Sequence, residues 1–168
     1  MRYALTRIVL TVAMVFAAQI ASSQQAQISF STAAFDKTNP VEVTADALSV
    51  NQTDGSAVFE GNVLVIQGEV RMSAGRVTVE YTQDAGAPNG ISRLLASGGV
   101  TFVTANDAVE ARDATYSVAG ATVRLTGDVL LTQGPNAISG DTLTVDLEAG
   151  TGTMEGRVRT VFNTGGGN

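Results

Sequence analysis

The chain has 168 residues, ten of them basic and sixteen acidic, and it contains no cysteine and no histidine. This composition excludes disulfide staples, thiol nucleophiles and imidazole bases. An acidic chain does not attract nucleic acid or anionic headgroups through its overall charge, so we expect no nucleic-acid partner.

Residues 1–23 have the pattern of a secretory signal peptide. The first seven residues carry two arginines and no acid, residues 8–20 are mostly apolar, and small residues follow. An apolar run of 13 residues is short for a membrane span, which favours a cleaved signal over an anchor. We expect cleavage after Ser23, which removes both arginines and leaves 8 basic against 16 acidic residues, a net charge of −8.

The remaining chain is predicted to be all-β. Residues 24–40 are polar and small and are predicted to form a flexible leader, and the glycine-rich residues 163–168 a disordered tail. Between them, apolar residues fall at every second position in segments that turn residues separate, which is typical of strands with one buried face. The predicted strands are 41–50, 56–67, 70–81, 91–104, 109–118, 121–133, 137–147 and 153–162.

Two short motifs recur along these strands with one period. The first centres on a glycine, at positions 61, 98, 127 and 156, with spacings of 37, 29 and 29 residues. The second centres on positions 46, 75, 112 and 141, with spacings of 29, 37 and 29, and an inserted loop at 83–90 accounts for the longer interval. Such repetition is typical of units that bury their apolar faces by stacking. We expect the long strands to bend at the repeated Gly or Asp.

The parity of both motifs predicts two facing apolar walls. In the second motif the inward side chains begin with Leu48 and Val50, and the plainest interpretation of the whole set is a β-sandwich core. The repeated acids do not favour an enzyme, because Asp46 and Asp141 are replaced by Gly75 and Arg112 in the other copies. A position with such variety indicates a corner or a solvated face. We expect no catalytic residue, no metal site and no cofactor.

Several segments together resemble a known family. They are Ala45-Asp46-Ala47-Leu48-Ser49-Val50, the Gly61-Asn62-Val63 that follows, and residues 68–74 and 91–100, behind a secretory signal. Over residues 41–162 the chain resembles the periplasmic lipopolysaccharide-transport proteins of the LptA/OstA type, with their OstA-like N-terminal domain. The resemblance implies a folded-over, taco-like antiparallel β-jellyroll. It also implies a hydrophobic groove that shields the acyl chains of lipopolysaccharide, and units that stack between inner-membrane and outer-membrane jellyroll partners.

The resemblance and the parity together predict which side chains line the groove. These are Phe59, Val63, Val65, Val79, Tyr81, Val100, Phe102, Tyr116, Val129, Leu131, Leu143 and Val145. The first strand (41–50) and the last (153–162) would leave unpaired edges, which predicts head-to-tail self-association. The chain departs from the family pattern at Arg157 and Arg159, where neutral residues are usual.

Three alternatives stay open. The first is a cell-envelope β-repeat scaffold with a filled core and no lipid cargo. The second is a membrane-anchored relative that keeps its first 20 residues. The third is a carbohydrate-active β-solenoid, which needs converging carboxylates that the repeats do not supply.

Overall fold

The computed structural model describes residues 26–30, 35–51, 55–82 and 90–162. The predicted signal peptide, most of the inserted loop and the predicted tail lie outside these residues. All regular elements in the described part are strands, which form one 13-stranded antiparallel sheet. The all-β prediction is therefore confirmed. No helix among the described residues is long and apolar enough to cross a membrane.

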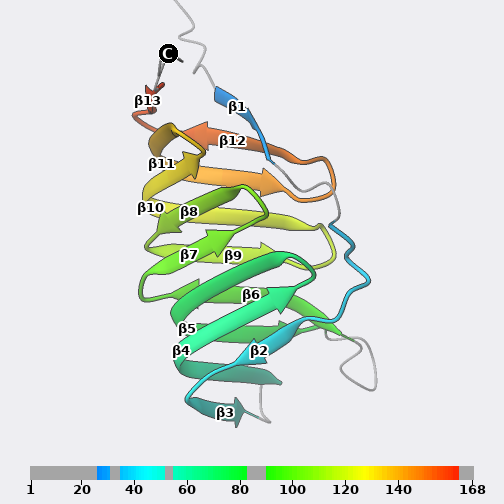
Figure 1. The fold of residues 1–168 in the computed structure, drawn as a ribbon. Helices are drawn as coiled ribbons and strands as arrows, with labels where there is room; N and C mark the ends of the chain where they lie inside the picture. Colours follow the sequence, from blue (N-terminus) through cyan, green and yellow to red (C-terminus); the bar gives the residue numbers. More distant parts are fainter. Residues whose placement is uncertain (1–25, 31–34, 52–54, 83–89, 163–168) are drawn as a thin grey trace, which may run out of the picture.

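Four long strands form the frame of the sheet (Figure 1). They are β4 (Ser56–Gln67), β5 (Val70–Tyr81), β10 (Thr122–Gln133) and β11 (Asn136–Asp146). The shorter strands are β1 (Ala26–Ser29), β2 (Glu42–Thr44), β3 (Ala47–Asn51), β6 (Ile91–Ser97), β7 (Val100–Val103), β8 (Asp107–Ala111), β9 (Asp113–Ser117), β12 (Thr151–Glu155) and β13 (Arg159–Val161). The bounds of β4 and β5 agree with the predicted strands. Four other predicted strands are each divided in two at the motif positions.

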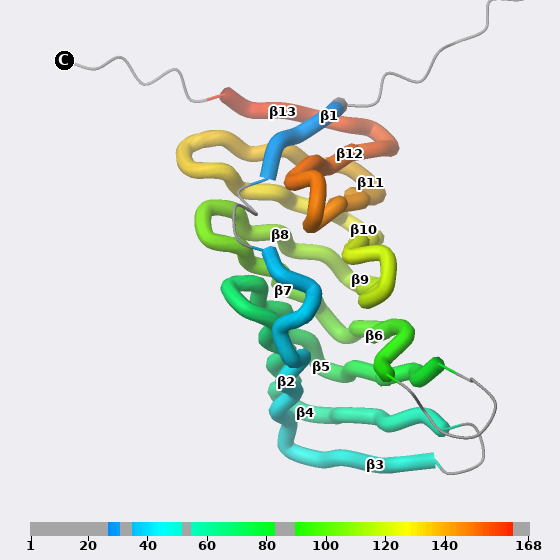
Figure 2. Tube along the Cα trace, turned by 90° about the vertical axis from the view of Figure 1, so that its right-hand side faces the viewer, coloured from blue at the N-terminus to red at the C-terminus, as the bar shows by residue number. Residues whose placement is uncertain are grey.

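The sheet folds over on itself because each long strand belongs to two walls. Wall A has the order β1–β12–β11–β10–β9–β6–β5–β4–β3. Wall B has the order β13–β11–β10–β8–β7–β5–β4–β2. The pairing register of β4 shifts between Glu60 and Val63, and that of β10 between Thr126 and Val129, where the chain passes from one wall to the other. We call this shared side of the molecule the corner, and the opposite side, where the turns of both walls and the N-terminal segment lie, the mouth (Figure 2).

The glycine motif builds the corner. Gly61 and Asn62 have φ of +77° and +45°, and Gly127 and Asp128 have φ of +84° and +50°. Two successive left-handed residues add a bulge that turns the strand sharply, and glycine adopts the first of them without steric cost. The expected bend at the repeated glycine is therefore confirmed, and it is the same bend in successive repeats.

The second motif packs against this bend. The Asp46 N–H donates to the carbonyl of Gly61 at 2.9 Å, and the Asp46 carboxylate accepts a bond from the Asn62 amide at 2.7 Å. At the last corner the same places are held by Asp141 and Arg157, whose side chains lie 2.8 Å apart. These side chains are solvent-accessible, so the interpretation of the repeated acids as corner residues is confirmed.

Part of the predicted leader is a structural element. Strand β1 pairs with β12 in the register Ala26 with Met154, and both Ile28 and Phe30 are buried. A side chain on Gly152 would collide with the ring of Phe30, so the ring lies directly on that backbone. The reason for the difference is that β12 alone would leave wall A with an open edge and an uncovered core end. Residues 26–30 cover both.

Replacing Gly61 by Ala should destabilise the fold by more than a left-handed φ alone explains. An added Cβ would lie 2.5 Å from the Asp46 carboxylate, so strain and collision combine to cost roughly 2–4 kcal/mol. Gly134 has φ of +54° with nothing within 4 Å of an added Cβ, so Gly134→Ala is the matched control at roughly 1 kcal/mol. Urea unfolding of the two variants measures both costs. Equal losses of stability in the two variants would show that the close contact between Asp46 and Gly61 adds nothing to the cost of the substitution.

Candidate functional site

The space between the two walls is a continuous apolar interior. Register places Val65, Met72, Phe102, Val109 and Leu131 side by side across wall B. All five are at most 4% exposed. A row perpendicular to the strands follows the long axis of the folded sheet. The repeat has therefore aligned one inward position of each strand into a single apolar stripe.

Wall A carries the facing stripes. One row joins Val79, Leu94, Tyr116, Val123 and Val145 through successive pairings. A second row lies beside it and ends at Met154, which is fully buried. Apolar rows therefore face each other along the length of the molecule.

The predicted lining residues divide equally between the walls. Wall A supplies Phe59, Val79, Tyr81, Tyr116, Leu143 and Val145, and wall B supplies Val63, Val65, Val100, Phe102, Val129 and Leu131. Ten of the twelve are buried, whereas Phe59 and Tyr81 are partly buried and pack against the core. The structure thus brings the predicted positions into one interior, and their role toward a lipid stays a prediction.

Leu48 and Val50 lie on the interior side of wall A, as predicted, but they are not enclosed. Both continue the wall A rows, since they pair with Phe59 and Ala57, but they are 56% and 65% exposed. They lie on β3, the last strand of wall A, and no strand lies beyond β3 to enclose them. The interior is therefore open to solvent at this end, whereas β1 covers the wall A end at β12.

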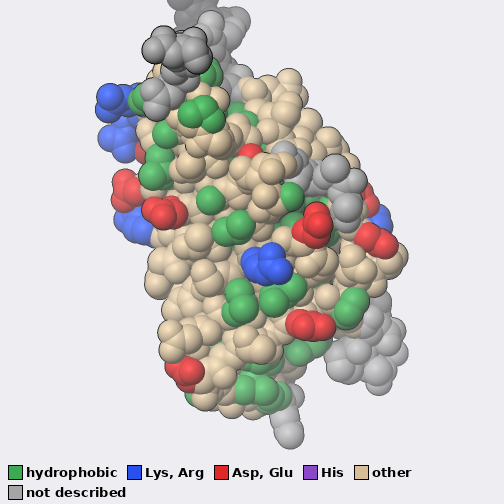
Figure 3. Space-filling model, viewed as in Figure 1, with side chains coloured by type: hydrophobic (Ala, Val, Ile, Leu, Met, Phe, Trp, Pro, Cys, Tyr) green, Lys and Arg blue, Asp and Glu red, His purple; other side chains and the backbone are tan. Residues whose placement is uncertain are grey.

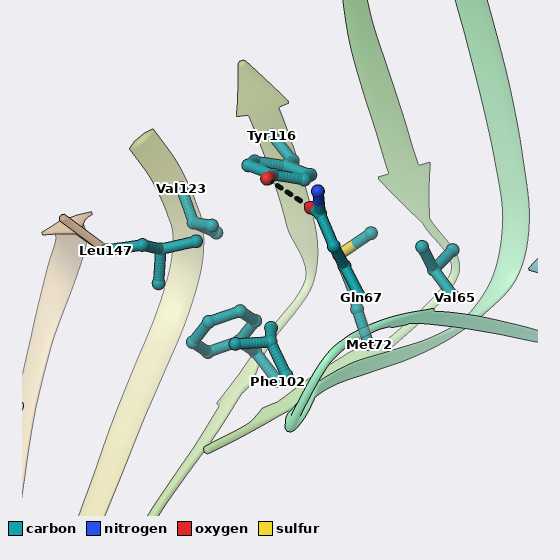
Figure 4. Close-up of a pocket in the computed structure, with 8 residues that line it drawn as sticks. Val65, Gln67, Met72, Phe102, Tyr116, Val123 and Leu147 are labelled. Atoms are coloured by element: carbon teal, nitrogen blue, oxygen red, sulfur yellow. Dashed lines mark hydrogen bonds between the residues drawn. The ribbon is translucent and has the colours of Figure 1, made fainter. Parts of the chain in front are cut away.

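A buried polar pair joins the walls near the mouth. Gln67, at the end of β4 in wall B, is 3% exposed, and its Oε1 accepts a hydrogen bond of 2.5 Å from the Tyr116 hydroxyl of wall A (Figure 4). The Gln67 Nε2 donates to the carbonyls of Asn39 at 2.9 Å and Lys37 at 3.2 Å. We did not predict a role for Gln67, although it follows Val63 and Val65 at the same parity.

The interior is filled by side chains. Beside the polar pair lies a cavity of about 20 Å³, room for about one water molecule. Its walls are formed by Val65, Gln67, Val70, Met72, Phe102, Tyr116, Val123 and Leu147. A molecule larger than water enters only if the two walls move apart.

Polar chemistry is confined to the margins of this interior. Asp107 is the one buried charged residue in the described part, at the start of β8, where Thr104 and Gln133 donate to its carboxylate at 3.1 and 2.8 Å. Among the described residues, no cluster of three or more His, Cys, Asp or Glu side chains could hold a metal ion. The interior between the walls therefore offers mainly apolar surface.

Fold and interior together define a folded-over β-jellyroll with internal repeats. Residues 42–151 match the family model of the LptA/(LptD N-terminal domain) LPS transport protein. The chain belongs to this family, so the family predicted from the two motifs is confirmed. The family is one of transport proteins and not of enzymes.

The chain is also similar to a solved structure, which shares its fold, and to a relative of related sequence. The chain is similar to LptH, the LptA homologous periplasmic component of the conserved lipopolysaccharide transport device from Pseudomonas aeruginosa. The TM-score is 0.67 at 19% identity, with 77% of this chain and 99% of that chain covered, which shows the shared fold. An uncharacterized protein from Rhizobium meliloti (strain 1021) is 29% identical over 128 residues, 71% of this chain and 69% of that protein. The jellyroll prediction is therefore confirmed.

Alkaline pH should test the Gln67–Tyr116 pair. Burial raises the pKa of Tyr116 to about 12, above the ordinary value of 10.0. The neutral phenol is therefore favoured in the folded state, so its contribution to stability is complete below pH 10 and is lost as the pH rises from 10 to 12. The loss amounts to at most roughly 3 kcal/mol. Urea unfolding between pH 10 and pH 12 should show this loss of unfolding free energy in the parent and a smaller loss in Tyr116→Phe. If the unfolding free energies of the two proteins depend on pH in the same way, the prediction is wrong.

Proposed function

We propose that this protein carries lipopolysaccharide through the periplasm, with the acyl chains of the lipid held between walls A and B. The observation that supports this most is the set of uninterrupted apolar rows that run along the molecule. Each acyl CH₂ left in water costs about 0.8 kcal/mol, so a chain of about twelve carbons costs on the order of 10 kcal/mol. A lipid with several chains needs such an apolar path to cross water.

The construction of the walls supports a hinge-like opening. At the corner the walls are continuous, because β4, β5, β10 and β11 cross from one to the other. At the mouth each wall ends in turns of its own. The walls therefore part at the mouth about the corner, and the buried rows then become the lining of a groove.

Surface charge supports an apolar rather than an electrostatic mode of binding. The face in Figure 3 carries separate acidic and basic side chains among neutral ones and shows no broad basic patch. The ion pairs at the corner, such as Arg112 with Asp128 at 3.5 Å, join exposed side chains. This supports the proposal that apolar contacts, more than contacts with the lipid phosphates, hold the cargo.

The ends of the walls support a bridge of jellyroll units between inner-membrane and outer-membrane partners. At one end, β3 presents the exposed Leu48 and Val50 beside an unpaired strand edge. At the other, β13 and the residue after it present Val161 and Phe162, 50% and 70% exposed. Unpaired edges with apolar side chains are templates for pairing with another chain. The predicted C-terminal edge strand (153–162) needs one correction. In wall A, β1 covers β12 and forms the outer edge, so only β13 is an edge strand, in wall B.

The alternative is a cell-envelope scaffold that uses these edges without carrying lipid. The filled interior, with its cavity of about 20 Å³, favours this second candidate. The two functions differ in one respect, whether the interior ever meets an acyl chain.

Photo-crosslinking should decide between carrier and scaffold. A photoreactive phenylalanine at position 102 lies inside wall B, next to the cavity, whereas the same residue at Glu110, on the neighbouring strand, is exposed. The carrier predicts a crosslink to lipopolysaccharide from position 102 and none from position 110, with circular dichroism of a β protein in both. A folded protein with no crosslink from position 102 supports the scaffold and excludes the carrier.

A charge at the β3 end should weaken head-to-tail association. Val50→Asp removes an apolar contact of roughly 1–2 kcal/mol at the edge, so the association constant should fall about tenfold or more. Leu130→Asp is the matched control, because Leu130 is 39% exposed but lies on β10, which is paired on both sides and is not an edge strand. Sedimentation equilibrium measures both. If the two variants weaken association equally, or neither does, the β3 edge is not the contact.

A further inference from the structure

The N-terminal segment runs along the mouth. In Figure 2 the described residues that follow 34 pass from the β1 end toward β2 between the turns of wall A and the turns of wall B. We call residues 26–30 and 35–41 the strap. The strap is the part of the described chain that contacts both walls on the side where no strand joins them.

Five polar contacts tie the strap down, three on wall B and two on wall A. On wall B, Gln133 Nε2 donates to the Ser29 carbonyl at 2.8 Å, and Gln67 binds the strap carbonyls described above. On wall A, the Phe30 N–H donates to the Gly150 carbonyl at 2.8 Å, and Lys37 Nζ lies 2.7 Å from the carboxylate of Glu148. The strap therefore holds the two margins of the mouth at a fixed separation.

The two halves of the strap are held differently. Residues 26–29 form β1 with four paired positions, and the buried apolar side chains of this half are Ile28 on the strand and Phe30 just after it. Residues 35–41 form a turn around Asp36, and their apolar contacts with the core come from the partly buried Phe35 and Val41. The side chains of Lys37 and Glu148 are each about half exposed, and such a pair contributes little. The half at 35–41 is therefore the one that releases first, and β1 is its anchor.

We propose that the strap is an intramolecular lock on the mouth, and that release of residues 35–41 from Gln67 and Glu148 is the step that lets the walls part and admit an acyl chain. The part of this inference that concerns the acyl chain rests on the proposed carrier function. The lock itself rests on contacts within the chain, which do not involve a lipid. The two can therefore be tested separately.

Lys37 reports on the lock, because it is the single lysine of the chain. Because Gln67 holds the Lys37 carbonyl, we expect endoproteinase Lys-C to cut after Lys37 mainly when the strap leaves the mouth, so the rate of that cut measures release without lipid. Gln67→Glu keeps the acceptor for the Tyr116 hydroxyl and the shape of the side chain. It replaces the amide donor by a carboxylate oxygen that faces two carbonyls, so the contact becomes repulsive.

The cleavage experiment compares Gln67→Glu with Tyr116→Phe from pH 7 to pH 10, because the introduced carboxyl donates to a strap carbonyl while it is protonated and repels both carbonyls once it is ionised. Tyr116→Phe removes the bond between the walls but leaves both amide bonds to the strap. We expect Gln67→Glu to be cut at Lys37 about tenfold faster than the parent, and Tyr116→Phe to be cut at the parent rate. Equal rates for Gln67→Glu and the parent would overturn the lock.

The second experiment closes the lock covalently. A carbodiimide activates the Glu148 carboxyl, the Lys37 amine displaces the urea, and an amide joins strap to wall A over the 2.7 Å contact. Glu148→Gln, treated in the same way, undergoes the same surface modification without this crosslink. Peptide mass spectrometry confirms the amide. Uptake of fluorescently labelled lipopolysaccharide should then be at least tenfold slower in the crosslinked protein than in treated Glu148→Gln.

The outcomes separate the two proposals. Equal uptake by the crosslinked protein and by treated Glu148→Gln overturns the gating role of the strap and leaves the carrier intact. If the untreated parent takes up no lipopolysaccharide, the carrier function is overturned, and the gating role with it. The rate of cleavage at Lys37 still decides whether the strap is a lock.

Discussion

The architecture depends on one backbone constraint, the left-handed pair that starts at the repeated glycine. At Gly61, Gly127 and Gly156 the chain takes φ of +77°, +84° and +76°, and the residue after each glycine is also left-handed. Because the bend occurs at the same place in each repeat, the corners stack and the inward positions of successive strands fall into rows. Without a common bend, the long strands would form a single open sheet with one exposed apolar face. The two-walled interior is thus a consequence of where glycine recurs.

The side chains around these corners are less constrained than the backbone. Asp46 meets Asn62, Arg112 meets Asp128, and the last corner has the opposite charge order. All of these pairs are exposed, and exposed pairs contribute little to stability. Their identity can therefore vary between repeats as long as the residue fits over the glycine. This explains why the repeat keeps its geometry while its charges change.

The corner and the mouth have opposite physical characters. The corner is held by continuous strands and strained backbone, so it resists separation. The mouth is held by side chains, namely the Gln67–Tyr116 bond and the contacts of the N-terminal segment. A lipid carrier needs an interior that is closed to water yet able to open, and this arrangement concentrates the breakable contacts on one side. The polar pair is buried on both walls, which makes its separation costly unless water or a ligand replaces the bond.

The sequence by itself determined the strands, the repeat and the bends at the corner, because alternation, turn residues and glycine spacing are local signals, and its resemblance to the LptA/OstA type indicated the family. The strands predicted at 56–67 and 70–81 have the same bounds as β4 and β5 in the structure. Only the tertiary structure decided which inward positions are enclosed. Leu48 has the same parity as Leu143, yet it is 56% exposed because no strand lies beyond β3. Likewise β1 pairs with a strand more than a hundred residues away, and Gln67 meets a hydroxyl 49 residues further on, since burial and partner choice depend on what the fold places opposite.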